Sequence, residues 1–146
     1  MFSHVYLGVN DFTRAFQFYS TLLPVLGLQL KFCDEQAQCA AWWQAGVARP
    51  LLVVSRPHNG EPATPGNGQM TALLARNRAQ VDEAYAVALA HGAQDAGAPG
   101  LRPHYHPDYY GAYFRCPEGN KLCVCCHAPE QGGMSGQQAR QHQRQQ

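Results

Sequence analysis

Charge is scarce in this sequence. Only 14% of its 146 residues are Asp, Glu, Lys or Arg, and 11 basic residues against 10 acidic ones give a formal net charge of +1. No block of basic residues is present, which argues against nucleic acid as a partner. No apolar run approaches the roughly 20 residues that a membrane-spanning helix requires. We therefore expect a protein that engages neither nucleic acid nor a membrane.

A secretory signal is also missing. The chain passes from Met1 directly into a strand-like pattern, which predicts a cytoplasmic protein. In a reducing compartment the six cysteines are expected to be free thiols rather than disulfides. The length suits one domain, and the apolar fraction of 45% is that of an ordinary globular protein.

The first part of the chain predicts a strand, a helix and three further strands. Residues 3–10 alternate between aliphatic and other side chains, as in a half-buried strand. Asp11 is suited to cap the following helix, and Gly27 to end it. The buried stripe of this helix is expected to be Phe12, Ala15, Phe16, Tyr19, Leu22 and Leu23. The three further strands are predicted at residues 28–33, 39–44 and 49–55.

The same order of elements returns in the second part of the chain. Residues 56–68 hold three prolines and three glycines, which predicts a linker at about 57–67. Asn77 begins a helix, with Gln80 placed as in a capping box. The strands of this half are expected at residues 69–75, 93–98, 111–116 and 121–126. The two halves, about 2–56 and 68–127, match in element order and spacing and hardly at all residue by residue, which is weak evidence of a repeat.

The end of the chain has a different composition. Residues 128–146 contain seven glutamines and three glycines and almost nothing apolar. Such a segment cannot bury enough surface to order itself. We predict a Gln-rich disordered tail after a folded region of residues 1–127.

A loop dense in aromatic side chains precedes the last predicted hairpin. It places His104, Tyr105, His106, Tyr109 and Tyr110 within seven residues. Loops on a rigid scaffold often carry binding residues, so this loop is a candidate for ligand contacts. A surface loop stiffened by its two prolines is the alternative.

The order of elements and two motifs resemble the vicinal oxygen chelate superfamily. The motifs are Y-Y-G-A-Y-F-R-C-P-E-G-N-K (residues 109–121) and G-A-P-G-L-R-P-H-Y-H-P-D-Y-Y-G (residues 97–111). The second is similar to one bacterial glyoxalase-like branch of a superfamily that also includes extradiol dioxygenases and bleomycin-binding proteins. The resemblance implies an α+β fold in which two βαβββ modules form a half-open mixed barrel around a central cavity, with the helices outside. It also implies a homodimer.

The resemblance further implies a single divalent metal held by the first and last strands of each module. His4 falls on the first of these ligand positions and fits it. The last strand of the first module, residues 51–55, offers no Glu, His or Gln. The two positions in the second module read Met70 and Cys123, and Glu118 lies on the turn and not in the cavity.

Two interpretations of this substituted set remain open. His4, Met70 and Cys123 would suit a soft ion such as Cu(I) or Zn(II), since thiolate and thioether ligands favour soft metals. Alternatively, Met70 and Cys123 fill the floor of the cavity as adaptable apolar groups, with no metal. The second interpretation is the simpler one.

Strand alternation adds candidate ligand-binding residues. Gly111, Tyr113 and Arg115 share one face of their strand, and Arg115 would be a cation for an anionic ligand. Trp42 or Trp43, of which only one can point inward, would stack on a planar ligand. The run C-V-C-C-H (residues 123–127) is not read as a zinc site, because Cys123 and Cys125 face one way and Cys126 the other.

Two functions follow as alternatives. The first is a glyoxalase-like enzyme, lactoylglutathione-lyase-like or dioxygenase-type, acting on a small oxygen-rich or thiol-conjugated substrate. His4 would serve as metal ligand or base, and His104, Tyr105, His106 and Tyr110 would close over the cavity, with Tyr110 as a second catalytic residue. The second is a metal-free small-molecule binding protein of the bleomycin-resistance type.

Overall fold

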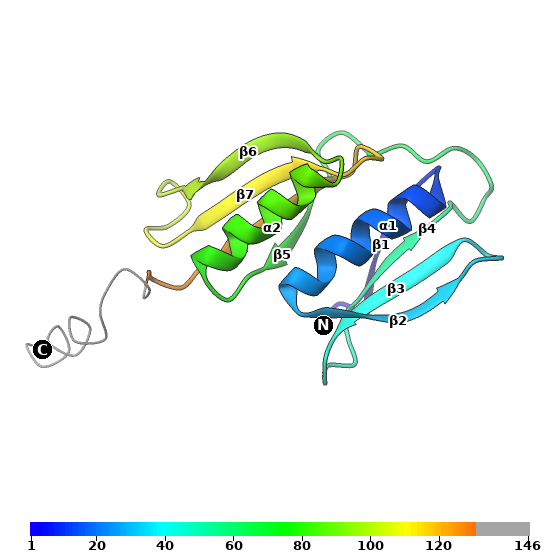
Figure 1. The fold of residues 1–146 in the computed structure, drawn as a ribbon, viewed down its shortest axis with the longest axis horizontal. Helices are drawn as coiled ribbons and strands as arrows, with labels where there is room; N and C mark the ends of the chain where they lie inside the picture. The colour runs from blue at the N-terminus through cyan, green and yellow to red at the C-terminus, as the bar shows by residue number, and fades with distance from the viewer. Residues whose placement is uncertain (131–146) are drawn as a thin grey trace, which may run out of the picture.

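Two modules of the same element order make up the computed structural model, which describes residues 1–130 (Figure 1). The first module begins with strand β1 (His4–Gly8), helix α1 (Phe12–Leu22) and a 3₁₀ turn η1 (Leu23–Leu26). It continues with strands β2 (Leu28–Asp34), β3 (Cys39–Gln44) and β4 (Leu51–Ser55). All four predicted strands and the helix of this half are therefore present.

The second module contains β5 (Thr71–Leu74), α2 (Arg78–Ala90), β6 (Gln94–Leu101), β7 (Tyr110–Arg115) and β8 (Lys121–Cys126). Strand β8 has the predicted limits, whereas β5 is shorter and β6 longer than the sequence predicted. Most of the predicted tail, residues 131–146, lies outside the described residues. No helix within residues 1–130 is long and apolar enough to cross a membrane.

Each module forms a four-stranded mixed sheet. The strand orders are β1-β4-β3-β2 and β5-β8-β7-β6, with parallel pairing of β1 to β4 and of β5 to β8. The sheets do not close on each other, and together they form the expected half-open barrel with the helices outside. Figure 1 shows α1 and α2 lying beside each other over the two sheets. The face of each sheet that points away from the helices is called the inner face below.

Local sequence explains where the helices begin and end. The side chain of Asp11 accepts a hydrogen bond from the backbone N–H of Arg14 at 3.1 Å, and that of Asn77 accepts one from Gln80 at 2.8 Å. Both contacts satisfy a backbone donor that the first turn of a helix leaves free. Gly27 ends η1 at a φ of 79°, a left-handed conformation that costs glycine little.

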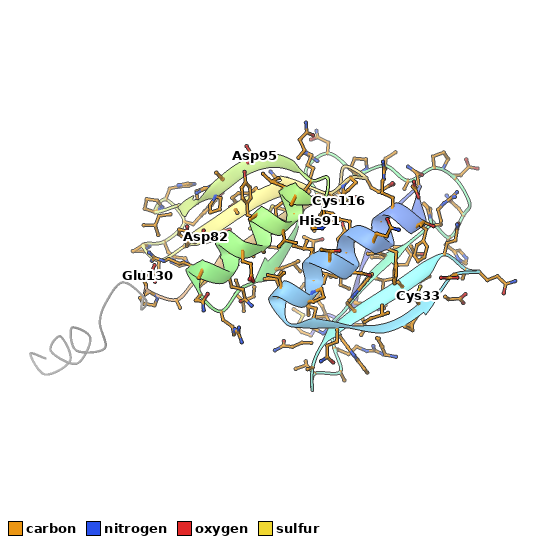
Figure 2. The ribbon with its side chains drawn as sticks, viewed as in Figure 1. Cys33, Asp82, His91, Asp95, Cys116 and Glu130 are labelled. Atoms are coloured by element: carbon orange, nitrogen blue, oxygen red, sulfur yellow. The ribbon has the colours of Figure 1, made fainter. Side chains whose placement is uncertain are left out.

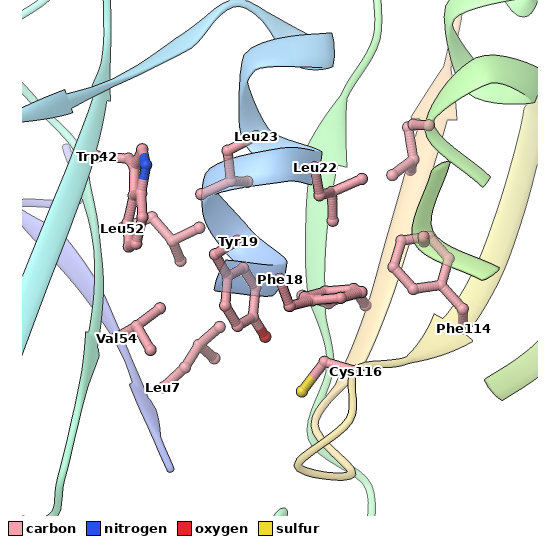
Figure 3. Packing of buried hydrophobic residues seen from close by; sticks show 14 of the residues in the cluster. Leu7, Phe18, Tyr19, Leu22, Leu23, Trp42, Leu52, Val54, Phe114 and Cys116 are labelled. Carbon is pink, nitrogen blue, oxygen red and sulfur yellow. The ribbon is translucent and has the colours of Figure 1, made fainter. Parts of the chain in front are cut away.

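One hydrophobic core serves both modules. Figure 3 shows Phe18 and Tyr19 of α1 between Trp42 of the first sheet and Phe114 of the second. The predicted stripe of α1 is buried as expected, except that Phe16 is half-buried and Phe18 joins the core. A smaller apolar cluster, formed by Ala41, Leu51 and Val53, lies on the inner face of the first sheet.

Polar contacts also join the modules. The turn between β7 and β8 reaches the start of α1, where the carboxylate of Glu118 accepts hydrogen bonds from the backbone of Asn10 and Asp11 and from Arg14. Asn120 donates from its side chain to the carbonyl of Gly8 at 2.9 Å. The second module is thereby fixed against the β1–α1 corner of the first.

Candidate functional site

The inner face of the second sheet carries a cluster of thiols and phenols. On β8, Leu122, Val124 and Cys126 belong to the helix-side core, so the alternation of the strand places Cys123 and Cys125 on the inner face. Antiparallel pairing sets Tyr113 directly opposite Cys123, and Gly111 opposite Cys125. This confirms that Cys125 and Cys126 face opposite ways.

The sulfur of Cys123 lies at the centre of this cluster and is fully buried. The hydroxyl of Tyr109 lies 3.5 Å from the Cys123 sulfur and 3.0 Å from the hydroxyl of Tyr113. Gly111 leaves room for this arrangement, because a Cβ there would lie 2.9 Å from the ring of Tyr109. Two phenol groups therefore meet above one thiol.

The surroundings of Cys123 favour its thiolate. A hydrogen bond from the Cys125 thiol is the largest influence and lowers the pKa of Cys123, whereas burial raises it. Hydrogen bonds from Tyr109 and Tyr113 and the charge of Arg102 lower it further, and the resulting pKa is about 6. The pKa of Cys125 is raised far above its usual range, chiefly because its proton is held in the hydrogen bond to Cys123.

Two histidines continue the network toward solvent. The Nε2 of His106 lies 2.8 Å from the Nδ1 of His127, and the Nε2 of His127 lies 3.6 Å from the sulfur of Cys125. The ring of Tyr109 packs edge-on against both imidazoles. His127 follows β8 directly and continues its alternation, so it reaches the same face as Cys125.

Cations surround the Tyr113 ring. The guanidinium carbon of Arg102 and the ammonium of Lys121 each lie 5.5 Å from the ring centroid. Arg115 shares the face of Tyr113 and donates to the carbonyl of Gly119 at 3.0 Å. Within residues 1–130, no carboxylate lies within 4.0 Å of these three cations. The inner face of the second sheet therefore carries positive charge that is free to meet an anion.

A groove runs between β1 and β5, where the two sheets meet without backbone pairing. Its polar end has a volume of about 420 Å³ and is lined by residues including Tyr6, Gln69, Thr71 and Lys121. Its apolar end has a volume of about 380 Å³ and is lined by residues including Phe2, Trp42 and Leu73. Val5, Met70 and Thr71 line both ends. Lys121 connects the groove to the Tyr113 cluster.

The predicted metal ligands have different surroundings. His4 is exposed on β1 and hydrogen-bonds the hydroxyl of Ser3 at 3.0 Å. Met70 is 45% exposed at the groove, and Cys123 contacts Tyr109, Tyr113 and Cys125. Within residues 1–130, no three His, Cys, Asp or Glu side chains are arranged to hold a metal ion. These donors do not fit the divalent ion that the resemblance implied, and no step below depends on one.

The remaining predicted site residues lie partly on the inner faces of the sheets and partly on the faces that pack against the helices. Trp43 is half-buried in the inner-face cluster, whereas Trp42 packs against α1. Tyr110 is also on the helix side and donates to Asp82 of α2 at 2.6 Å (Asp82 is labelled in Figure 2). The expectation that Tyr110 faces the inner side was wrong, because Tyr110 bonds α2 and its neighbour Tyr109 lies on the inner face beside Cys123. His104 packs on Tyr105, whose ring centroid lies 4.9 Å from that of Tyr109.

Sequence reasoning did not name Arg102 or His127, and it did not single out Tyr109 among the tyrosines of the loop. The alternation of β8 put Cys125 on the face of Cys123 and could have added His127. The alternation of Gly111, Tyr113 and Arg115 could likewise have placed Tyr109, rather than Tyr110, on their face. Arg102 lies in the same loop, at its other end.

The comparisons with known proteins agree with this architecture. The model of the Glyoxalase/Bleomycin resistance protein/Dioxygenase superfamily matches residues 1–124, and the chain belongs to that superfamily. A glyoxalase/bleomycin resistance protein from Albidiferax ferrireducens T118 is 33% identical, with a TM-score of 0.77, over 86% of this chain and 98% of that one. Comparison with curated proteins gave no match.

More distant structures share the fold. A glyoxalase-related enzyme from Fulvimarina pelagi is 17% identical, with a TM-score of 0.67 over 86% of this chain and 87% of that one. A lactoylglutathione lyase from Agrobacterium tumefaciens is 20% identical, with a TM-score of 0.60 over 86% and 92% of the two chains. At these identities the likeness concerns the fold alone.

Proposed function

We propose that this protein binds a small anionic molecule with a planar or apolar part, without needing a metal ion. The observation that supports this proposal is the groove between β1 and β5, whose polar end contains Lys121 and whose other end is apolar. The exposed ring of Tyr6 offers a surface for planar groups. Arg102 and Arg115 on the adjoining face add charge for an anion.

The glyoxalase-like reaction remains the alternative, because the chain shares its superfamily with a lyase. That reaction would require His4 to act together with ligands that the described side chains do not assemble. The homodimer and the cytoplasmic location implied by the sequence stay predictions.

The test uses 1-anilinonaphthalene-8-sulfonate, a planar fluorescent anion, with Lys121→Met and a matched control. Lys31→Met is the control, since the Lys31 ammonium also lies over an aromatic ring, that of Trp43 at 4.9 Å, on the first sheet and outside the groove. We expect about a tenfold rise in Kd for Lys121→Met, the size of one charged contact of about 1.4 kcal/mol, and almost none for Lys31→Met.

The binding titrations are repeated with EDTA and with added Zn(II), Ni(II), Mn(II) or Fe(II). Binding that is unchanged by EDTA supports the metal-independent function. Binding that requires one of these ions, together with stoichiometric metal that disappears in His4→Ala, would support the enzyme instead. Equal effects of Lys31→Met and Lys121→Met would show that the dye does not report on the groove.

A further inference from the structure

We propose that Cys123 is a nucleophile that adds to soft carbon electrophiles of the α,β-unsaturated carbonyl class. This activity goes beyond binding in the groove and does not depend on it, because the thiol lies on the inner face of β8. The proposal rests on the two phenol groups, those of Tyr109 and Tyr113, that lie beside one sulfur atom and on the cations that flank Tyr113.

The contacts of Cys123 differ from those of a thiol that only fills space. The hydroxyl of Tyr109 lies 3.5 Å from the Cys123 sulfur and 3.0 Å from the hydroxyl of Tyr113, the residue paired with Cys123 across β7 and β8. A phenol O–H at this place can donate to the sulfur. Donors that converge on a sulfur stabilise its negative charge, and the thiolate is the reactive form of cysteine. The lowered pKa of Cys123 agrees with this geometry.

Cys126 is an internal control for the reactivity of Cys123. Cys126, three residues further along β8, faces the helix side among Leu122 and Val124. Its thiol lies 3.9 Å from the carbonyl of Ala128, to which it donates. Both sulfurs are buried on one strand, so a difference in their reactivity reports on surroundings rather than on burial.

The reaction balances without an oxidant or a cofactor. The thiolate of Cys123 forms a bond to the β-carbon of the electrophile, and the alkene electron pair moves onto the carbonyl as an enolate. A phenol proton from Tyr109 or Tyr113 passes to the α-carbon, and the phenol regains its proton from solvent. The sum is one thiol and one alkene giving one thioether. Arg102 and Lys121, beside Tyr113, would stabilise the enolate charge.

Access to the sulfur requires Tyr109 to move. This residue lies at the end of the loop before β7, where its backbone N–H donates to His106 and its carbonyl accepts from Arg102 at 2.8 Å. These backbone contacts do not hold the side chain, whose rotation would break only the contacts of its hydroxyl with Tyr113 and Cys123 and of its half-buried ring with its aromatic neighbours. Rotation of the ring would uncover the thiol while the loop stays in place.

The experiment measures the rate of N-ethylmaleimide addition at each of the six cysteines, by peptide mass spectrometry, on the folded full chain between pH 5 and pH 8. A thiol with a pKa near 6 is half ionised at pH 6, against about 0.3% for an ordinary thiol. The weaker nucleophilicity of the more acidic thiolate removes about tenfold of that advantage. We therefore expect Cys123 to react about tenfold faster at pH 6 than the partly exposed Cys33 and Cys39.

Two conservative variants separate activation from exposure. Tyr113→Phe and Tyr109→Phe keep the ring and remove the donor, and each is expected to slow the addition at pH 6 several-fold and to move the pH profile of the rate upward. Tyr105→Phe is the control and should change neither, because the exposed ring of Tyr105 packs on His104 and Tyr109 and, within residues 1–130, its hydroxyl is not hydrogen-bonded to the cluster. Circular dichroism establishes that each variant is folded.

Addition at Cys123 no faster than at Cys126 in the wild-type protein would overturn the proposal. So would addition that appears only in Tyr109→Ala, since the thiol would then be merely covered. Because the wild-type comparison needs no variant, the proposal can be judged even where a substitution prevents folding.

Discussion

Glu118 and Arg14, 104 residues apart in the sequence, form an ion pair of 2.7 Å that ties the β7–β8 turn of the second module to the start of α1 in the first. The carboxylate side chain is only 3% exposed, whereas the arginine side chain is 54% exposed. Glu118 also accepts from two backbone N–H groups at the first turn of α1, where the helix dipole favours negative charge. The glutamate is therefore the more important of the two partners.

Replacing this carboxylate is expected to lower stability. Glu118→Gln keeps the size of the side chain and removes its charge, and we expect the free energy of unfolding to fall by about 1–3 kcal/mol. The measurement is urea denaturation at pH 7. Glu83→Gln, on the exposed side of α2, is the control and should change stability by less than about 0.5 kcal/mol. Equal losses in the two variants would contradict the proposed role of Glu118.

The contribution of Glu118 to the free energy of unfolding should depend on pH. Burial raises the pKa of Glu118, but the hydrogen bonds from Asn10, Arg14 and Asp11 outweigh it, and the net shift is downward. A depressed pKa stabilises the fold above the unfolded value, about 4.3 for Glu, and this stabilisation is lost as the pH falls through the folded value. The stability difference between wild type and Glu118→Gln should be constant from pH 7 to about pH 5 and shrink below about pH 4. A difference that stays constant from pH 5 down to the acid unfolding of the protein would be inconsistent with this linkage.

The adjacent residues Trp42 and Trp43 should differ in their contribution to stability and in their accessibility to a quencher. Trp42 is 1% exposed and packs on Phe16 and Tyr19, whereas Trp43 is half-buried on the inner face. Trp42→Phe is expected to cost about 2 kcal/mol of unfolding free energy, and Trp43→Phe less than about 1 kcal/mol. Acrylamide quenching gives a second readout: the Trp42→Phe protein, which retains Trp43, should be quenched more strongly. Equal quenching of the two variants would mean that both indoles are equally accessible.

Substitution by alanine should destabilise the protein far more at Gly111 than at Gly100, the glycine paired with it on β6. A Cβ at Gly111 would meet the ring of Tyr109 at 2.9 Å and the Cβ of Cys125 at 3.4 Å. At Gly100, opposite it on β6, the added Cβ would meet the flexible end of Arg102 at 3.0 Å and the carbonyl of Ala98 at an ordinary contact distance of 4.0 Å. We expect Gly111→Ala to cost about 1–3 kcal/mol in a denaturation experiment and Gly100→Ala much less. A Gly111→Ala protein as stable as wild type would show that Tyr109 has room to move aside.

Much of the fold could be predicted because local and long-range signals agree in it. Asp11 and Asn77 cap their helices as expected, and the alternation in β8 correctly separates Cys123 and Cys125 from Cys126. Strand β6 was underestimated because Gly97, Pro99 and Gly100 are poor strand formers, which the edge of a sheet with shifted register tolerates.

The site was harder to predict than the fold. The loop before β7 has no periodicity of its own, so the sequence could not place Tyr105 relative to Cys123. The alternation of β7 separates the other two tyrosines: Tyr110 faces α2, and Tyr109 lies on the inner side with Gly111 and Tyr113. A shift of one residue in the pairing register of β7 would exchange the two phenols.

The repeated element order suggests two separable units, but the single core makes them interdependent. A fragment ending at the linker would expose the side of α1 that packs toward α2 and would lose Glu118 from its first turn. The other fragment would leave Phe114 and Cys116 without their cover from Phe18 and Tyr19. We therefore expect neither module to fold alone and the two to unfold as one cooperative body.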